Sequence, residues 1–180
     1  MKRSHFIVVV VVVVAIAAAV GIRYFTDRYS IDGSPAEIEA AIERSYGKQI
    51  DVRNRVVTGN KLHFIFTDGQ TVGSGELTRG WNRKYKLEYF GYGTNQIRER
   101  IVETNNGQYL MLAGRNDSDI GSIRAFIEGD EYEAAIPEDP YYIVMTPVQR
   151  TKLAFTSAMI VYDRTGKEIQ RINLAAGEER

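Results

Sequence analysis

The pattern of hydrophobic and polar positions divides the chain into two unequal parts. Residues 6–22 read FIVVVVVVVAIAAAVGI and contain no charged or strongly hydrogen-bonding side chain. In water such a valine run favours strands, but in lipid the backbone must satisfy its own hydrogen bonds, so the segment becomes a helix. At about 1.5 Å per residue this run is roughly 26 Å long, close to the thickness of a bilayer core. The pattern therefore predicts a transmembrane helix or signal anchor over residues 1–22.

Charged residues on both sides of this segment suggest its orientation. Lys2 and Arg3 precede it, while Arg23 and Arg28, offset by Asp27, follow it. The charge bias favours an N-terminus in the cytoplasm. A short N-terminal segment followed by a long polar domain then places that domain outside the cytoplasm. We expect a single-pass protein of the cell membrane with an extracytoplasmic C-terminal domain.

The same stretch also has features of a cleavable signal peptide. It has a basic start, an apolar centre and the small residues Ala17 and Ala19 at the A-x-A spacing. The apolar run continues past these alanines through Val20 and Ile22, which favours a retained anchor. Cleavage after residue 19 remains the alternative, and both interpretations export the rest of the chain.

One amphipathic helix is expected after a membrane-proximal linker at residues 23–33. The sequence SPAEIEAAIERSYG begins with Ser34 as a candidate N-cap, Pro35 at the first helical position and Glu37 completing a capping box. Gly47 ends the helix. Four positions share one face at helical spacing: Ile38, Ala41, Ile42 and Ser45. This face is expected to pack on a sheet.

Beyond Gly47 the hydrophobic period changes to two, which is typical of strands. Strands are expected at 52–57, 61–67, 84–90, 97–104, 108–113, 122–128, 141–146, 155–163 and 168–173. Turn signals separate them at Gly59-Asn60, Asp68-Gly69, Asn106-Gly107, Gly129-Asp130 and residues 163–166. The pattern predicts an α+β fold that is mostly β, with the helix packed on antiparallel sheets in a sandwich or rolled sheet. This domain covers residues 34–176, either as one unit or with a sub-boundary near residue 105.

The C-terminal part has a family resemblance. The stretch LAGRNDSDIGSIRAFIEGDEYEAAIPEDPYYIVM, followed by IVYDRTGKEI, contains a Gly-x-Asn before an Ile-x-x-Ile strand and a Tyr-Asp-x-x-Gly-Lys-x-Ile hairpin. It resembles the C-terminal β module of small uncharacterised anchored proteins and lipoproteins of Gram-positive bacteria. The resemblance covers about a third of the chain and implies an exported β domain, without any catalytic residue to carry over. This chain lacks the lipoprotein cysteine and has the valine-rich helix instead.

Composition excludes several classes of protein. The 23 basic and 23 acidic residues give a net charge of +0, so no general attraction to nucleic acid is expected. The sequence has no cysteine, which excludes disulfides, thiolate metal sites and a cysteine nucleophile. An exported domain without disulfides indicates a bacterial envelope rather than a disulfide-rich secretion route.

Residues that carry catalysis in other proteins are sparse. The sequence has two histidines, His5 beside the apolar segment and His63 in the strand 61–67. His63 lies on the less apolar face of that strand, so we expect a half-exposed residue without a catalytic role. Ser74 in VGSGE does not have the G-x-S-x-G spacing of a hydrolase nucleophile.

Acidic residues gather in two loops, NDSDIG at 116–121 and EGDEYE at 128–133. Their oxygens suit Ca²⁺, but the spacing is not that of an EF-hand. An Asx-type turn and a solvated hairpin tip are the favoured interpretations. A hydrolase would need two converging carboxylates, drawn from the candidates Glu88, Glu99, Glu128 and Glu133. We predict no metal, no cofactor and no catalytic residue.

The most unusual surface is expected in TRGWNRKYKLEYFGYG at 78–93. Strand alternation places cations and aromatic rings on one side: Arg79, Trp81, Arg83, Tyr85, Leu87 and Tyr89. The favoured interpretation is that Trp81, Tyr85, Leu87 and Tyr89 belong to the core. The alternative is a partner-binding patch that consists of Arg79, Trp81, Arg83 and Tyr92, with Tyr85 and Leu87 facing inward.

The sequence therefore predicts a membrane-anchored extracytoplasmic module of the bacterial cell envelope that binds or assists without catalysis. Its partner would be an envelope protein or a wall polymer. Two alternatives remain open. One is an envelope hydrolase that uses carboxylates, and the other is an accessory or sensor subunit that acts through its membrane helix.

Overall fold

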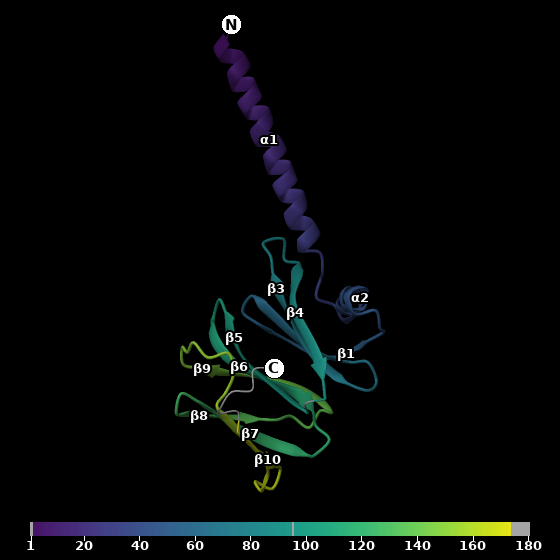
Figure 1. The fold of residues 1–180 in the computed structure, drawn as a ribbon, viewed down its shortest axis with the longest axis vertical. Helices are drawn as coiled ribbons and strands as arrows, with labels where there is room; N and C mark the ends of the chain where they lie inside the picture. Colours follow the sequence, from purple (N-terminus) through teal and green to yellow (C-terminus); the bar gives the residue numbers. More distant parts are fainter. Residues whose placement is uncertain (1, 95, 174–180) are drawn as a thin grey trace.

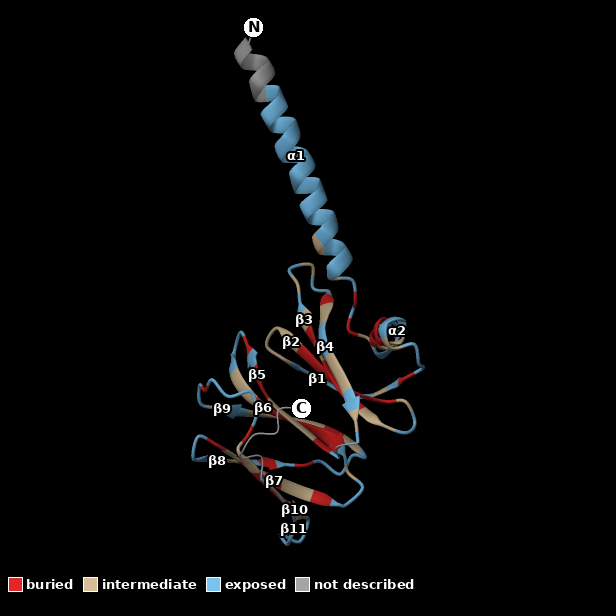
Figure 2. Ribbon diagram, viewed as in Figure 1, coloured by how far each residue is buried: buried red, intermediate tan, exposed pale blue. Residues whose placement is uncertain are grey.

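The computed structural model describes residues 2–94 and 96–173, and it begins with a long helix that projects from a β-rich body (Figure 1). Helix α1 (Lys2–Arg28) contains one segment, Val8–Arg28, that is long and apolar enough to cross a membrane. Its residues 8–22 are all exposed to solvent (Figure 2). The helix continues through residues 23–28, where the sequence predicts a linker. Only residues 29–34 therefore connect it to the next helix.

Helix α2 (Pro35–Tyr46) forms where the sequence predicts it. The Ser34 hydroxyl accepts a hydrogen bond from the Glu37 N–H at 3.4 Å, and Gly47 ends the helix at a φ of 73°. The Ser34 N–H donates to Asp32 Oδ1 at 2.7 Å rather than to Glu37, so the capping box is only half formed. The predicted apolar face is buried at Ile38, Ala41 and Ile42, whereas Ser45 is exposed.

Eleven strands form three antiparallel sheets in the described part of the chain. The first sheet is a meander of β1 (Asp51–Thr58), β2 (Lys61–Thr67), β3 (Val72–Arg79) and β4 (Tyr85–Gly93). The second has the order β5 (Ile97–Thr104), β6 (Gly107–Arg115) and β9 (Tyr141–Val148). The third has the order β11 (Glu168–Asn173), β10 (Ala158–Asp163), β7 (Ile120–Ile127) and β8 (Asp130–Ala135). The predicted α+β, mostly β class is confirmed.

Two of these strands, β3 and β8, were not among the predicted ones. The glycines of β3 favour turns by local propensity, but they leave room for aromatic rings from β2. A Cβ at Gly73 would overlap the Phe66 ring, and one at Gly75 would overlap the Phe64 ring. Packing between strands therefore overrides the turn signal. β8 is a charged edge strand that pairs only with β7 among the described strands.

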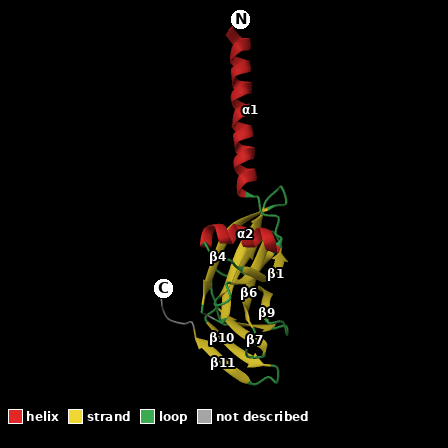
Figure 3. Cartoon of the chain, turned by 90° about the vertical axis from the view of Figure 1, so that its right-hand side faces the viewer, coloured by secondary structure: helices red, strands yellow, loops and turns green. Residues whose placement is uncertain are grey.

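Two hydrophobic cores hold the sheets together. In the first, the buried face of α2 packs with residues of the first sheet, including Leu62, Phe64 and Leu77. In the second, the second and third sheets face one another in the manner of a sandwich, around residues that include Leu110 and Ile123. α2 lies at the end of the β body nearest to α1 (Figure 3). The two cores divide the chain between β4 and β5.

Polar contacts join the two halves across this division. The Arg98 guanidinium donates from Nε and Nη2 to the Val72 carbonyl at 3.1 and 2.7 Å. Asn54 Nδ2 donates to the Tyr141 carbonyl at 3.0 Å. These bonds link β5 to β3 and β1 to β9, so the first and second sheets lie against each other.

Candidate functional site

The predicted partner-binding patch is split in the structure. Arg79, Trp81 and Arg83 lie together at the β3–β4 hairpin, and all three are exposed. A turn interrupts the expected extended run, with the Gly80 N–H donating to the Lys84 carbonyl at 2.7 Å. Tyr92 lies near the other end of β4, roughly 23 Å from the hairpin end of that strand at about 3.3 Å per residue. It packs instead against Tyr46 of α2, with ring centroids 4.3 Å apart.

The favoured core interpretation is wrong for two of the four aromatic and aliphatic positions. Trp81 is 70% exposed and Tyr89 is 45% exposed, whereas Tyr85 is buried and Leu87 is half-buried. A bulge explains Tyr89. Leu77 pairs with Leu87 but the preceding Glu76 pairs with Tyr89, so β4 has one extra residue at this point. That residue moves Tyr89 to the opposite face of the sheet.

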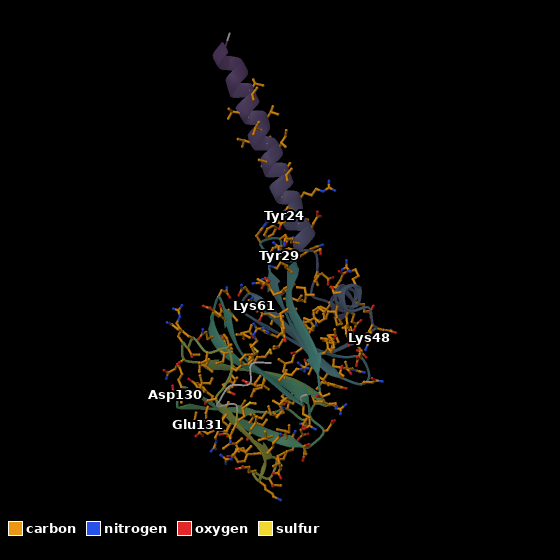
Figure 4. All side chains as sticks on the ribbon, viewed as in Figure 1. Tyr24, Tyr29, Lys48, Lys61, Asp130 and Glu131 are labelled. Atoms are coloured by element: carbon orange, nitrogen blue, oxygen red, sulfur yellow. The ribbon has the colours of Figure 1, made fainter. Side chains whose placement is uncertain are left out.

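The hairpin packs on the C-terminal end of α1. The Phe25 ring stacks on Tyr29 with centroids 4.3 Å apart, and the Trp81 ring lies 5.4 Å from Phe25. Asn82 Nδ2 donates to the Tyr29 carbonyl at 2.9 Å. A Cβ at Gly80 would lie 2.6 Å from the Tyr29 ring, so this position needs glycine. Figure 4 shows Tyr24 and Tyr29 where α1 meets the β body.

A groove of about 1100 Å³ opens between the first sheet and the rest of the β body. We call it the inter-sheet groove. Its lining comes from several strands and from the segment between β9 and β10, and includes Ser74, Tyr89, Gln96, Arg98, Glu99, Arg100, Phe155, Thr156 and Gln170. The Arg100 guanidinium lies 5.0 Å from the centre of the Tyr89 ring. Phe155 is 57% exposed. The groove thus presents guanidinium groups, amides and aromatic faces together.

Glu99 is the only carboxylic acid among the described residues that line the inter-sheet groove. Burial raises the pKa of Glu99, while a hydrogen bond from the Thr156 N–H at 2.9 Å acts in the opposite direction. The other glutamates considered for catalysis lie elsewhere: Glu88 pairs with Lys86, Glu133 lies near Arg124, and Glu128 lines a second groove of about 860 Å³. The four candidates therefore do not converge in one groove.

His63 is buried, with 1% of its surface exposed, so the expectation of a half-exposed residue is wrong. Its Nδ1 lies 3.9 Å from Glu76 Oε2, and the other oxygen of Glu76 lies 2.5 Å from Lys61 Nζ. Burial lowers the pKa of His63 to about 4, and the charge of Glu76 only partly offsets this effect. His63 lines neither groove, and its Nε2 has no hydrogen-bond partner among the described residues.

In the first acidic loop a side chain bonds a nearby backbone N–H, as predicted, but four residues on rather than the two of an Asx turn. Asn116 Oδ1 accepts from the Ile120 N–H at 2.7 Å, and Asp119 adopts a φ of 52°. Asp119 also pairs with Arg164 at 2.7 Å. In the second loop, Glu131 pairs with Arg124 at 2.8 Å. Within the described ranges no three His, Cys, Asp or Glu side chains are grouped so that they could hold a metal ion.

Comparisons with known proteins give no further guidance to the site. The chain matches no protein-family model, no curated protein and no solved structure at a significant level. The resemblance of the C-terminal part to anchored Gram-positive proteins therefore stays a prediction.

Proposed function

We propose that the chain is a membrane-anchored, extracytoplasmic binding module of the bacterial cell envelope, and that its inter-sheet groove binds a wall polymer. The apolar, exposed segment of α1 is the observation that supports anchoring in a membrane. Its residues 8–22 are apolar and exposed, and no part of the β body covers them (Figure 2). An uncovered apolar helix of this length is stable in lipid and unfavourable in water.

The lining of the inter-sheet groove supports a polymer ligand. Aromatic faces such as Tyr89 and Phe155 pack against the C–H faces of sugar rings, while Gln96 and Gln170 offer amide donors and acceptors to hydroxyl groups. Arg100, stacked on Tyr89, adds a charge that suits the carboxylate or phosphate groups of an anionic polymer. A groove with these three kinds of group suits a sugar polymer.

Anchoring and export can be tested on the full chain in a bacterial host. The protein should sediment with membranes, resist extraction by salt or alkali and require detergent for release. Protease added outside intact spheroplasts should degrade the β body. A soluble exported product beginning at Val20 would show that the segment is a cleaved signal peptide. Protection of the β body in intact spheroplasts would contradict the extracytoplasmic location.

Groove binding can be tested with purified wall polymer and two matched variants. Arg100→Ala removes the cation stacked on Tyr89 in the inter-sheet groove, and it should weaken polymer binding about tenfold or more. Arg53→Ala removes a similar cation, stacked on Tyr141 at 5.5 Å outside the groove, and should leave binding unchanged. Equal affinities of the two variants would exclude the groove as the binding site.

A second candidate function has one observation in its favour. A glutamate whose pKa is raised by burial, such as Glu99, is suited to act as a general acid. An envelope hydrolase would then cleave the polymer that the inter-sheet groove binds with Glu99 as its acid, and the attacking water would act without a second carboxylate, since the described lining holds none. Glu99→Gln should abolish the release of reducing ends from the polymer while binding persists. Binding without any cleavage by the unmodified chain would exclude the hydrolase.

A further inference from the structure

We propose that the β3–β4 hairpin docks on the membrane surface, where Trp81 enters the headgroup zone and Arg79, Arg83 and Lys84 bind anionic lipid headgroups. The docking depends on the anchoring proposed above. In this proposal the three patch residues of the hairpin, Arg79, Trp81 and Arg83, contact lipid instead of an envelope protein.

The position of the hairpin follows from α1. The uninterrupted apolar run ends at Ile22, and Phe25 lies three residues further, or about 4.5 Å along the helix axis. Trp81 lies 5.4 Å from Phe25 between ring centroids. The headgroup region adds roughly 5–8 Å to each side of the hydrocarbon core. If α1 spans the bilayer, the Trp81 ring therefore reaches the headgroup zone.

The connection between the helix and the hairpin is short and fixed. Ile31 lies just beyond α1 and forms an antiparallel bridge with Tyr85 at the start of β4. The two N–H···O bonds of this bridge measure 3.1 and 2.6 Å. Together with the Asn82 bond to Tyr29, they hold the hairpin tip beside the helix end. The tip is thus kept at the level at which the helix leaves the bilayer.

The chemistry of Trp81 suits this position. An indole ring that is 70% exposed leaves a large apolar surface in water unless another surface covers it. Tryptophan is enriched at membrane–water interfaces, where its apolar ring is covered and its N–H remains hydrated. Phe25 lies beside it and stacks in turn on Tyr29, so the three rings form a continuous aromatic cluster at the end of α1.

The charges around this cluster favour anionic lipid. Arg79, Arg83 and Lys84 surround Trp81 in the sequence of the hairpin, and none of them forms an ion pair with another described residue. Arg23 and Arg28 of α1 add two further cations on the same side of the apolar run, against one acid, Asp27. Each cation held near an anionic membrane strengthens binding roughly fivefold.

The sequence offers a direct probe, because Trp81 is its only tryptophan. The full chain is reconstituted into vesicles of phosphatidylcholine, with and without an equal part of phosphatidylglycerol. The vesicles contain lipids brominated either near the headgroup or near the bilayer centre. We expect blue-shifted Trp81 emission, quenched more by bromine near the headgroup than by bromine at the centre, and more in anionic than in neutral vesicles.

A charge-reversal variant and a matched control test whether the basic residues of the hairpin bind anionic headgroups. Arg79→Glu with Arg83→Glu should lower the quenching in anionic vesicles to the level seen in neutral ones. The matched control, Arg150→Glu with Lys167→Glu, makes the same change in net charge on exposed residues outside the hairpin and should be quenched like the unmodified chain. Circular dichroism checks that both variants keep the β structure.

The outcomes distinguish the docking from the anchoring. A chain that fails to float with vesicles refutes the anchoring itself. A chain that floats but shows the unquenched emission of a hydrated indole refutes only the docking. Blue-shifted emission without bromine quenching means that a protein surface, such as a second copy of the chain, covers Trp81, and it also overturns the inference. Equal quenching in anionic and neutral vesicles overturns the assignment of anionic headgroups.

Discussion

Replacement of the buried histidine should remove a defined part of the pH dependence of stability. His63 lies between the first and second sheets with 1% of its surface exposed. Burial lowers its pKa to about 4, from 6.5 in an exposed histidine. Three charged groups act on it: Glu76 raises the pKa, while Lys61 and Arg100 lower it. At neutral pH the side chain is therefore uncharged in both the folded and the unfolded chain.

The sign of the effect follows from the difference in proton binding. As the pH falls from 6.5 towards 4, the unfolded chain protonates at residue 63 while the folded chain does not. The unfolded state is therefore stabilised, and the free energy of unfolding falls by up to about 1.4 kcal/mol per pH unit. Between pH 7 and pH 5 the loss through His63 alone is about 2 kcal/mol, and it approaches about 3 kcal/mol near pH 4.

The measurement compares the unmodified chain with His63→Leu by guanidinium unfolding in detergent at several pH values. Leucine fills a similar volume and cannot titrate, so the difference in unfolding free energy between the two proteins should change by about 2 kcal/mol from pH 7 to pH 5. Carboxylates titrate in both proteins and cancel. His5 is the only other histidine in the sequence, and replacing it in both backgrounds removes its contribution. Parallel pH profiles of the two proteins would refute the assigned pKa.

Three further substitutions test the packing and capping of the β body by chemical unfolding. Gly73→Ala should lower the free energy of unfolding by about 1–3 kcal/mol, because its Cβ would overlap the Phe66 ring. In the control Gly93→Ala, the new Cβ meets only the end of a flexible side chain at 3.4 Å, so the free energy of unfolding should be nearly unchanged. Leu110→Ala should cost about 2–5 kcal/mol, because Leu110 is fully buried in the second core. Ser34→Ala should cost about 0.5–1 kcal/mol by removing the N-cap of α2, and a cost above that of Leu110→Ala would contradict the capping interpretation.

Local chemistry was enough to predict α2 and most of the strands. The N-cap at Ser34, the apolar spacing that follows it and the stop at Gly47 all act within a few residues. Turn signals such as Gly59-Asn60 and Asp68-Gly69 likewise act between neighbouring strands. Features of this kind can be predicted from a single sequence because the interacting groups are close along the chain.

Burial on both faces of a strand could not be predicted in this way. β2 reads as an alternating strand with Leu62, Phe64 and Phe66 on one face, and the structure buries that face against α2. The opposite face with His63 and Ile65 is also buried, because the second sheet covers it. The alternation of one strand contains no information about a second layer that forms from residues 30 or more positions away.

The core assignment of Trp81 and Tyr89 was wrong for a different reason. Alternation assigns faces correctly only while the register is unbroken, and two local events break it here. The turn at residues 80–84 removes Trp81 from the strand, and the extra residue at Glu88 moves Tyr89 to the other face. The two aromatics expected in the core thus become exposed, one beside α1 and one in the inter-sheet groove.

A β-bridge and a side-chain hydrogen bond bring the aromatic-basic hairpin to the end of the apolar helix. Residues 6–22 and 79–84 are almost 60 positions apart, and nothing in their composition links them. The bridge between Ile31 and Tyr85 brings the start of β4 to the end of α1, and Phe25 and Trp81 then come within 5.4 Å. Exposed aromatic and cationic groups that have no structural role in the β body thereby lie where an apolar helix would leave a bilayer. A membrane would suit both segments at once, and the proposed docking of the hairpin rests on this coincidence of an apolar helix with exposed aromatic and cationic groups at its end.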